Sequence, residues 1–362
     1  MKQRKIYILY EHGEDPRPYS PSYIRLLRPL THPSLRKRLE VDWGLQYENQ
    51  QVDAVIVDRL WRPDISPALA ESLVENIRQA GARLIYALDD NLLDLPGRQP
   101  TLASQDKAWP TEEHIRVVQF FLRQADGVIV PIKALRQRFL GFNPNIVVVP
   151  HALDERLLIR GAPPSGHPLF SPGRKVIGYM GTLTHDDDLM MVLPALWAVW
   201  QRHREEIEFQ IVGALGRADS LRALEGLPVR MVNLRPEETE YPLFMLWFSS
   251  RLHWHIAIAP LRDTPFNRCK SDIKFLDYSA IGAAGIYSRV PAYELSVRHL
   301  ETGWLAENDV GAWVEALEEL LSNDGLRIQI ARNATRYLYT ERTLARCAHC
   351  WLQALESLLD GR

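Results

Sequence analysis

Short apolar runs rich in β-branched residues alternate along this chain with longer stretches of helical periodicity. In the first half, the runs predict strands at 5–10, 54–58, 83–87, 127–131 and 146–150. Helix-like stretches separate them at 21–30, 68–80, 112–124 and 133–139. Such alternation is typical of parallel α/β units. A strand without polar positions, such as 128–130, indicates a sheet that helices cover on both faces.

The alternation stops at residues 160–174 and then begins again. This segment is rich in glycine and proline, which favour turns, and we interpret it as a linker between domains. After it, strands are predicted at 175–179, 208–212, 229–232, 255–259 and 285–287. Helices are predicted at 189–203, 218–224, 242–251, 272–280, 310–322 and 326–339, with a last amphipathic helix at 344–359.

The pattern therefore predicts an α/β protein with two Rossmann-like, doubly wound domains. The domains are residues 1–160 and 175–340, joined by the linker 161–174 and followed by a C-terminal helix at 341–362. A length of 362 residues agrees with two domains, since one domain usually takes about 100–200 residues. Ligands bind beyond the carboxyl ends of the strands in such sheets, so we expect the active site in the cleft between the domains.

Composition excludes several classes of protein. Lys and Arg total 43 and Asp and Glu total 45, and the resulting net charge of −2 argues against nucleic-acid binding. A locally basic stretch, 25–38, is interpreted as a solvated helix face. The basic and apolar start, 1–10, is too short for a signal peptide and is interpreted as the first strand. No window reaches the roughly 18 uninterrupted apolar residues of a membrane span.

Three cysteines in 362 residues argue against a disulfide scaffold and fit a reducing compartment. We therefore expect a cytoplasmic protein, with peripheral attachment at the inner membrane as an alternative. Cys347 and Cys350 form a Cys-x-x-Cys pair in a helical stretch. A structural zinc site normally needs a second pair of ligands and none is nearby, so core or helix-surface cysteines, and no bound metal, are expected.

Residues 265–282 predict a turn followed by a short helix with cationic residues near its start. Ser271 or Asp272 can cap the helix, and Gly282 can end it. The positive end of such a helix attracts anions, so its first turn is a candidate phosphate site.

Lys270, Lys274 and Asp277 stand at i, i+4 and i+7 in this segment and therefore share one side. Two ammonium groups beside a helix N-terminus suit a diphosphate, because they neutralise its charge as it becomes a leaving group. A carboxylate one turn later can accept hydrogen bonds from ribose hydroxyls. The alternative is a surface ion pair between Lys274 and Asp277, and spacing alone favours neither interpretation.

The strand at 175–179 leads into a second candidate, Gly178-x-x-Gly181. Glycines at a strand-to-helix turn let the backbone approach a phosphate, although any tight turn can require them. The three carboxylates at 186–188 would repel a diphosphate, and we interpret them as caps and dipole compensation in the first helical turn. His185 lies just before that helix, where it can face the cleft, although a lone histidine is more often structural.

In order and spacing, residues 174–334 resemble the donor-binding half of bacterial GT-B glycosyltransferases of the family 1 and family 4 type. The motifs that carry the resemblance are Gly178-Tyr179-Met180-Gly181-Thr182 with Thr184-His185, then 209–213, 256–261, 265–267 with Lys270-Ser271, 274–278, 282–288 and 302–305. The first half resembles the acceptor-side domain more loosely, through 23–26 with Pro29, Asp89-Asp90 and 147–151.

The resemblance implies a GT-B fold with a C-terminal helix packed back on the first domain, and catalysis without a bound metal or other cofactor. The expected function is transfer of a sugar from a nucleoside diphosphate sugar to a saccharide or glycolipid acceptor, in bacterial surface polysaccharide or glycan biosynthesis. The expected donor-binding residues are Gly181, Thr182, Asn267, Lys270, Ser271, Lys274 and Asp277.

Candidate acid–base groups are His185 and the pair Asp89–Asp90 at the end of a first-domain strand. Adjacent carboxylates can raise one another's pKa, which would suit a base near neutrality, but Asp90 can equally cap the following turn. Expected acceptor contacts lie after the first strand and on the first helix: His12, Gly13 and Arg25.

The chain departs from the family pattern at two places. Cys269 stands where many family-4 enzymes carry the first of two glutamates, and Asp277 stands at the second. The basic pair usual after the glycine turn is replaced by Thr184-His185-Asp186, so the phosphate role falls on Lys270 and Lys274. Two other functions therefore stay open: a sugar-nucleotide epimerase of the same fold, and a non-catalytic nucleotide-sugar-binding subunit.

Overall fold

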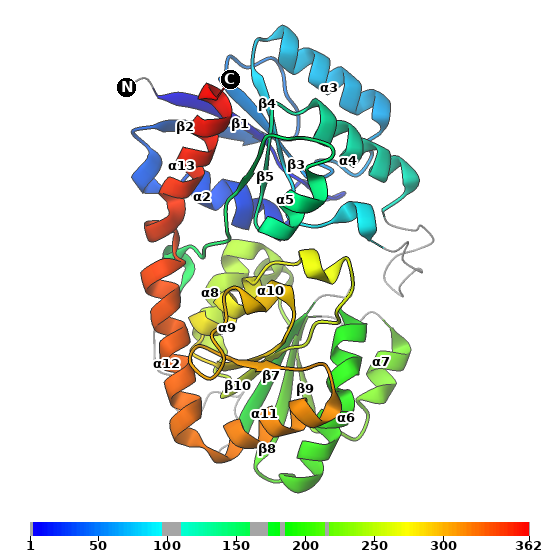
Figure 1. Ribbon diagram of the computed structural model, residues 1–362, viewed down its shortest axis with the longest axis vertical. Helices are drawn as coiled ribbons and strands as arrows, with labels where there is room; N and C mark the ends of the chain where they lie inside the picture. Colours follow the sequence, from blue (N-terminus) through cyan, green and yellow to red (C-terminus); the bar gives the residue numbers. More distant parts are fainter. Residues whose placement is uncertain (1–2, 96–109, 160–172, 182–184, 214–216, 362) are drawn as a thin grey trace.

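Figure 1 shows two α/β domains, one above the other, each built on a six-stranded sheet. This computed structural model describes residues 3–95, 110–159, 173–181, 185–213 and 217–361. The strand order is β2-β1-β3-β4-β5-β6 in the first sheet and β12-β11-β10-β7-β8-β9 in the second. Neighbouring strands are parallel in both sheets, so the predicted α/β class with two doubly wound domains is confirmed. Most of the predicted linker, 161–174, falls outside the described residues.

The first domain has its most apolar strands at the centre of the sheet. Its strands are β1 (Arg4–Leu9), β2 (Leu39–Gly44), β3 (Ala54–Asp58), β4 (Arg83–Ala87), β5 (Gly127–Val130) and β6 (Ile146–Val148). Its longer helices are α3 (Pro67–Gln79), α4 (Glu112–Gln124) and α5 (Lys133–Phe139). Every residue of β3 and β5 is buried, as a sheet covered on both faces requires. The sequence pattern misses β2, an edge strand whose exposed Glu40, Asp42 and Trp43 leave no apolar run.

The first helical segment has a π-helical turn at its centre. It runs through α1 (Ser20–Ser22), the π turn Tyr23–Leu27 and α2 (Arg28–Leu30). The interpretation of 25–38 as a solvated face is wrong for its first two arginines. Arg25 is only 2% exposed, with its guanidinium 4.5 Å from the ring of Trp351. Arg28 donates from Nε to Asp154 at 2.6 Å, so both arginines join the first helix to neighbouring elements.

The second domain repeats the architecture with two apolar layers. Its strands are β7 (Lys175–Gly181), β8 (Ile207–Gly213), β9 (Val229–Val232), β10 (Ile256–Ala259), β11 (Ala284–Ser288) and β12 (Trp304–Ala306). Its helices are α6 (Asp186–Arg202), α7 (Ala218–Ala223), α8 (Tyr241–Arg251), α9 (Ile273–Ala280), α10 (Pro291–Glu294), α11 (Val310–Ser322) and α12 (Asp324–Glu341). Residues of α6 and α11 form one apolar cluster, and residues of α8, α9 and α12 form another.

The last helix, α13 (Leu344–Asp360), leaves the second domain and lies against the first (Figure 1). Its buried Trp351, Leu355 and Leu358 join the apolar cluster that contains β1. The backbone of Thr343 pairs with Leu153, which follows β6. The chain therefore crosses between the domains beside the segment that ends the first domain.

Two cysteines lie on α13. Cys347 and Cys350 are half-buried free thiols, and the Sγ of Cys347 lies 2.9 Å from the carbonyl oxygen of Glu341. In the described ranges, no group of three or more His, Cys, Asp or Glu side chains is placed to hold a metal ion. The two cysteines therefore lie partly exposed on a helix.

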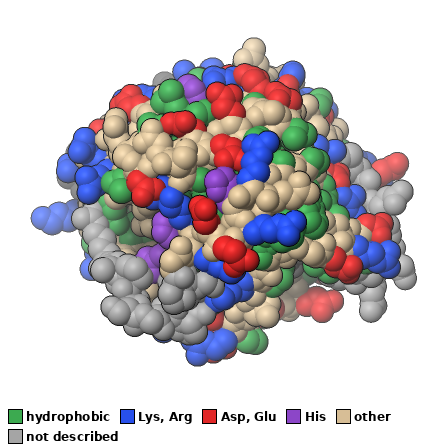
Figure 2. All heavy atoms as spheres, turned by 90° about the horizontal axis from the view of Figure 1, so that it is seen from below, with side chains coloured by type: hydrophobic (Ala, Val, Ile, Leu, Met, Phe, Trp, Pro, Cys, Tyr) green, Lys and Arg blue, Asp and Glu red, His purple; other side chains and the backbone are tan. Residues whose placement is uncertain are grey.

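Charges of both signs are interspersed on the described surface. Figure 2 shows this at the second-domain end of the molecule, where acidic and basic side chains alternate over short distances. The distribution agrees with a net charge of −2. Among the described residues, no helix combines the length and apolarity that crossing a membrane requires.

Gly282 ends the turn after α9 with φ of +71°, in the left-handed region, where the sequence predicts the helix end. A Cβ at this position would have no atom within 4 Å, so its effect comes from the backbone alone. Gly282→Ala is expected to lower the free energy of unfolding by about 1–2 kcal/mol, measured by chemical denaturation. Gly325→Ala, in the first turn of α12, is the control and is expected to raise it by up to about 1 kcal/mol. Equal losses in both variants would contradict this assignment of strain.

Candidate functional site

The loop between β10 and α9 brings cationic residues to the space between the domains. In Figure 1 it is the yellow segment that reaches towards α5. A 3₁₀ turn, Asn267–Cys269, leads to Lys270, and Asp272 is the N-cap of α9. Lys270 thus lies before the helix, while Lys274 lies in its first turn.

Lys270 contacts the first domain directly. Its ammonium lies 2.9 and 3.1 Å from the two carboxylate oxygens of Asp90, which follows β4. The same ammonium lies 4.6 Å from the centre of the Phe266 ring. The side chains of the ion pair are 20% and 21% exposed. The structure therefore brings an expected diphosphate-binding lysine and an expected catalytic carboxylate together.

Asp90 belongs to a charge network at the carboxyl ends of β1, β3 and β4. Arg59, after β3, lies 2.8 Å from Glu11, 2.9 Å from Asp89 and 3.6 Å from Asp90. Burial favours protonated Asp90, but Lys270 and Arg59 outweigh burial and lower the pKa of Asp90 to about 2. The expectation that the adjacent carboxylates provide a base near neutrality is therefore wrong for Asp90, because two cations dominate its surroundings.

His185 is the N-cap residue of α6. Its Nδ1 lies 2.8 Å from Oδ2 of Asp188, and its side chain is 16% exposed. Burial and the nearby ammonium of Lys274 lower the pKa of His185 to about 4, so the ring is neutral at physiological pH. With the Nδ1 hydrogen donated to the carboxylate, Nε2 carries the lone pair that can accept a proton.

The three carboxylates at 186–188 hold neighbouring loops. Asp186 accepts the backbone N–H of Arg217 at 2.9 Å, and Asp188 accepts that of Arg262 at 2.8 Å. Asp187 forms an ion pair with Arg262 at 2.8 Å. The interpretation of these residues as side-chain caps is wrong, since α6 has no side-chain cap among the residues described. Their place in the first turn still suits the helix dipole.

Lys274 is half-buried and Asp277 is buried. Lys274 lies 4.9 Å from the centre of the Tyr179 ring, and burial lowers the pKa of Lys274 to about 8. Asp277 is 5% exposed, and its Oδ1 has no hydrogen-bond partner in the described part of the chain. Burial raises the pKa of Asp277 to about 7. These two described residues form no ion pair, so a surface ion pair is the wrong alternative for them.

The remaining donor-site candidates have different surroundings. Asn267 is buried and donates to the carbonyl of Arg262 at 2.9 Å, which holds the loop. Ser271 is half-buried beside Lys270, and Gly181 is the last residue of β7. Gly178 serves packing, because a Cβ there would stand 1.8 Å from the Trp254 ring. Thr182 lies outside the described residues.

Cys269 is enclosed by the first domain. It is 7% exposed and belongs to the apolar cluster that contains Leu92 and Phe139. The side-chain amide of Asn91 lies 3.7 Å from its Sγ. Where the family pattern has a carboxylate, this chain therefore has an apolar contact between its domains.

A cavity of about 520 Å³ lies in the first domain beside the charge network. Its lining includes Glu11, His12, Tyr19, Arg59, Arg62 and His114. The loop after β3 has left-handed backbone at Arg59 and Trp61, with φ of 49° and 59°. Strain of this kind is more frequent at functional sites than elsewhere.

The expected acceptor residues divide between this cavity and the domain interior. His12 lines the cavity, and its Nδ1 donates to the carbonyl of Gly13 at 2.7 Å. Arg25 instead donates from Nη1 to the carbonyl of Val149 at 2.6 Å and is buried. Glu11 and Arg59 are not among the residues predicted from the sequence, although each directly follows a predicted strand, where ligands of such sheets bind.

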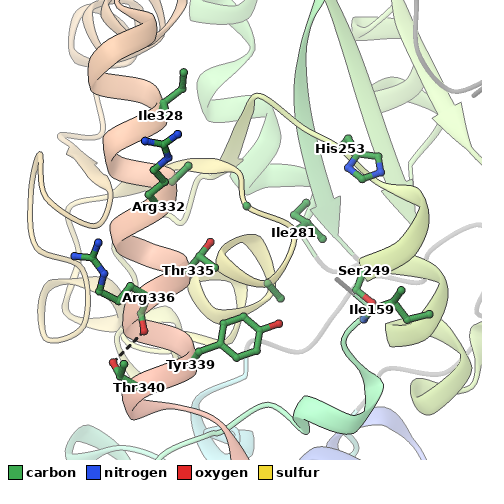
Figure 3. A pocket seen from close by; sticks show the side chains of 13 residues that line it. Ile159, Ser249, His253, Ile281, Ile328, Arg332, Thr335, Arg336, Tyr339 and Thr340 are labelled. Carbon is green, nitrogen blue, oxygen red and sulfur yellow. Dashed lines mark hydrogen bonds between the residues drawn. The ribbon is translucent and has the colours of Figure 1, made fainter. Parts of the chain in front are cut away.

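Two of the cavities at the second domain bear on the location of the site. One of about 360 Å³ lies between the domains, and Lys270, Asp272 and Arg342 are among its lining residues. The other, of about 700 Å³, lies between α12 and the end of α8 (Figure 3). Thr335 and Tyr339 point into it from α12. Because the residues lining this larger cavity include no expected site residue, volume alone does not identify the site.

Comparison with known proteins adds independent evidence about the second domain. Residues 174–323 match a family model described as "Glycosyl transferases group 1". No curated protein matches the chain.

Solved structures share the fold over most of the chain. HepE from Anabaena, in complex with UDP-glucose, aligns with a TM-score of 0.66 and 14% identity over 98% of this chain and 100% of that chain. A glycosyltransferase from Rickettsia africae aligns with a TM-score of 0.63 and 11% identity over 100% of both chains. Sucrose-phosphate synthase from Thermosynechococcus elongatus aligns with a TM-score of 0.58 and 14% identity over 86% of this chain and 75% of that chain. The resemblance to GT-B glycosyltransferases and the expected fold are confirmed.

Proposed function

We propose that this chain, a GT-B glycosyltransferase by its group 1 family match and its fold, transfers a sugar from a nucleoside diphosphate sugar to a saccharide or glycolipid acceptor. We further propose a place in bacterial surface polysaccharide or glycan biosynthesis. The donor would lie on the second domain and the acceptor would enter from the first.

The observation that carries the donor site is the placement of Lys270, Lys274 and Asp277 around the start of α9, at the inner side of the second domain. Partial burial of an ammonium without a direct carboxylate partner is unfavourable, and the lowered pKa of Lys274 reflects that cost. A bound diphosphate would offset this cost, because it would place two negative charges beside both lysines. The buried Oδ1 of Asp277, which lacks a partner in the described structure, would accept a ribose hydroxyl.

The other expected donor residues would complete this site. Gly181 would border the phosphates from the end of β7, Ser271 would offer a hydroxyl beside Lys270, and Asn267 would hold the loop that carries Lys270. Thr182, outside the described residues, is also a proposed donor contact. The two lysines would neutralise the leaving diphosphate in place of a cation, so we propose transfer without a bound metal or other cofactor.

Catalytic and acceptor roles rest on the groups that face the cleft. His185 is neutral and keeps Nε2 as an acceptor, so it is the proposed proton acceptor or the group that positions the sugar. Asp90, with a pKa of about 2, would act as an ionised carboxylate beside the reacting centre, with Asp89 held by Arg59 next to it. His12 would contact the acceptor in the first-domain cavity, with Gly13 next to it in the chain, and Arg25 would support the first helix from the domain interior.

A nucleotide panel tests the donor assignment. HepE from Anabaena has been solved with UDP, and so has the pneumococcal transferase GtfA, which makes UDP the first candidate. Among UDP, GDP, dTDP and CMP, we expect UDP to raise the melting temperature most. Ligand at 100 times its Kd stabilises the folded state by about 2.7 kcal/mol, which corresponds to several degrees. If none of the four shifts the transition at millimolar concentration, the donor-site proposal is wrong.

Incubation with the donor then separates the three candidate functions. Release of the nucleoside diphosphate that depends on an added acceptor supports transfer. Formation of an epimeric sugar nucleotide supports the epimerase, and tight binding without turnover supports a non-catalytic subunit.

A further inference from the structure

The start of α9 lacks the side-chain cap that its sequence offers. Asp272 occupies the N-cap position, where an aspartate normally accepts a hydrogen bond from an N–H of the first turn. Here its carboxylate makes no such bond. The carboxylate faces the other way and receives a guanidinium instead.

That guanidinium belongs to Arg342. Its Nη1 donates to Oδ2 of Asp272 at 2.8 Å and its Nη2 donates to Oδ1 at 3.1 Å. Nε and Nη2 also donate to the carbonyl oxygen of His151, at 3.0 and 2.9 Å. The Arg342 and Asp272 side chains are 11% and 7% exposed, so solvent screens the pair little. One side chain thus holds the helix N-cap and the end of the first domain.

The consequence for α9 is a free N-terminus. The first N–H groups of a helix have no acceptor within the helix, and a capping carboxylate normally takes one or two of them. The backbone N–H groups of Ser271, Ile273 and Lys274 have no acceptor among the residues that the structure describes. In the sequence they belong to the segment from Lys270 to Lys274, and the proposed donor diphosphate needs hydrogen-bond donors of this kind.

Arg342 also lies at the crossing of the chain between the domains. α12 ends at Glu341 and α13 begins at Leu344, so the arginine is in the short connection between them. Because α13 packs on the first domain, the position of Arg342 depends on how the domains are placed. The free N-terminus of α9 is therefore linked to the way in which the two domains are placed.

We propose that Arg342 is a positioning residue for donor binding. By holding the carboxylate of Asp272 away from the first turn of α9, it leaves the N–H groups of that turn free to bind the donor diphosphate and keeps the negative charge of Asp272 away from them. This inference rests on the proposed function. It predicts that the loss of donor affinity on removal of Arg342 is caused by the freed carboxylate of Asp272.

The test compares Arg342→Gln, Asp272→Ala and the double variant by calorimetric titration with UDP and with uridine. Without Arg342, the carboxylate of Asp272 is free to cap α9 and to repel phosphate, so Arg342→Gln is expected to weaken UDP binding about tenfold. Asp272→Ala is expected to leave the Kd for UDP within about threefold of wild type. The double variant is expected to recover most of the loss. Uridine, which has no phosphate, is expected to bind all variants alike.

A purely structural role predicts a different pattern. If Arg342 only fastened the domain crossing, removing Asp272 as well would not restore UDP affinity, and uridine affinity would fall in parallel with it. Either result, or a tenfold loss in Asp272→Ala alone, overturns the inference. If Arg342→Gln fails to fold, Arg342→Lys is used instead, because it keeps the positive charge between α12 and α13. It is expected to lose an intermediate amount of UDP affinity, which the additional change Asp272→Ala again restores. A wild-type chain that binds no nucleoside diphosphate overturns the proposed function, and this inference with it, whereas wild-type binding that Arg342→Gln leaves intact overturns the inference alone.

Discussion

Lys270→Ala is expected to lower kcat/KM for the donor by about 10²–10³-fold, the loss typical when one preorganised charge-stabilising group is removed from an active site. Its ammonium lies between the domains, 2.9 Å from Asp90, where the proposed leaving diphosphate would gain negative charge. Because that charge is larger in the transition state than in the bound donor, kcat is expected to fall more than KM rises. Steady-state release of nucleotide from the donor that the nucleotide panel selects is the measurement.

Two controls separate this role from a general effect of charge. Arg268→Ala removes a neighbouring cation that is exposed and paired with Asp263 at 2.6 Å, and little change is expected. Lys270→Ala also leaves Asp90 with Arg59 as its nearest cation, so the combination with Asp90→Asn tests whether unpaired Asp90 causes the loss. If the double variant regained the wild-type rate, Lys270 would serve only to neutralise Asp90. Equal losses in Arg268→Ala and Lys270→Ala would likewise contradict a specific contact.

Most of the fold could be predicted from the sequence because its signals are local. β9 and α11 have the bounds that periodicity predicts. The strands at the centre of each sheet, β3, β4, β7 and β10, carry no charged residue except at an end. β2 and β12 are missed for a physical reason. An edge strand exposes one face and part of its backbone edge, so β2 carries charges, while β12 has only three residues.

The candidate site could be predicted only where it lies on one segment. Lys270, Lys274 and Asp277 are close in the sequence, so a local pattern assigns them to one segment, although Lys270 lies before the helix and only the other two lie in it. The partner of Lys270 is Asp90, 180 residues away, and no local pattern carries that contact. The pKa of Asp90 depends on it, which is why the analysis of adjacent carboxylates predicted the opposite direction. The burial of Cys269 could not be predicted for a similar reason, since the residues that surround it belong to the core of the first domain and are distant in the sequence.

Asp277→Asn is expected to stabilise the protein above neutral pH while weakening donor binding. Burial raises the pKa of Asp277 from 3.8 to about 7 in the folded chain. Between these values the folded chain holds a proton that the unfolded chain has lost, so stability falls as pH rises, by about 1.4 kcal/mol for each pH unit from this group. Asparagine does not titrate, so the stability of the variant relative to wild type is expected to increase from pH 5 to pH 7 and then level off. Denaturation curves across this range measure the difference.

The same substitution is expected to weaken UDP binding about tenfold, because a charged acceptor for the ribose hydroxyls becomes a neutral one. Asp58→Asn is the matched control. Burial, with Glu11 nearby, raises the pKa of Asp58 to about 7 as well, but Asp58 accepts the hydroxyl of Ser22 in the first domain. The Asp58→Asn variant is expected to show the same change in the pH dependence of its stability, with unchanged affinity for UDP. If Asp277→Asn bound UDP as tightly as wild type, the buried carboxylate would need another role, since a protein gains nothing in stability from keeping it ionised without a partner.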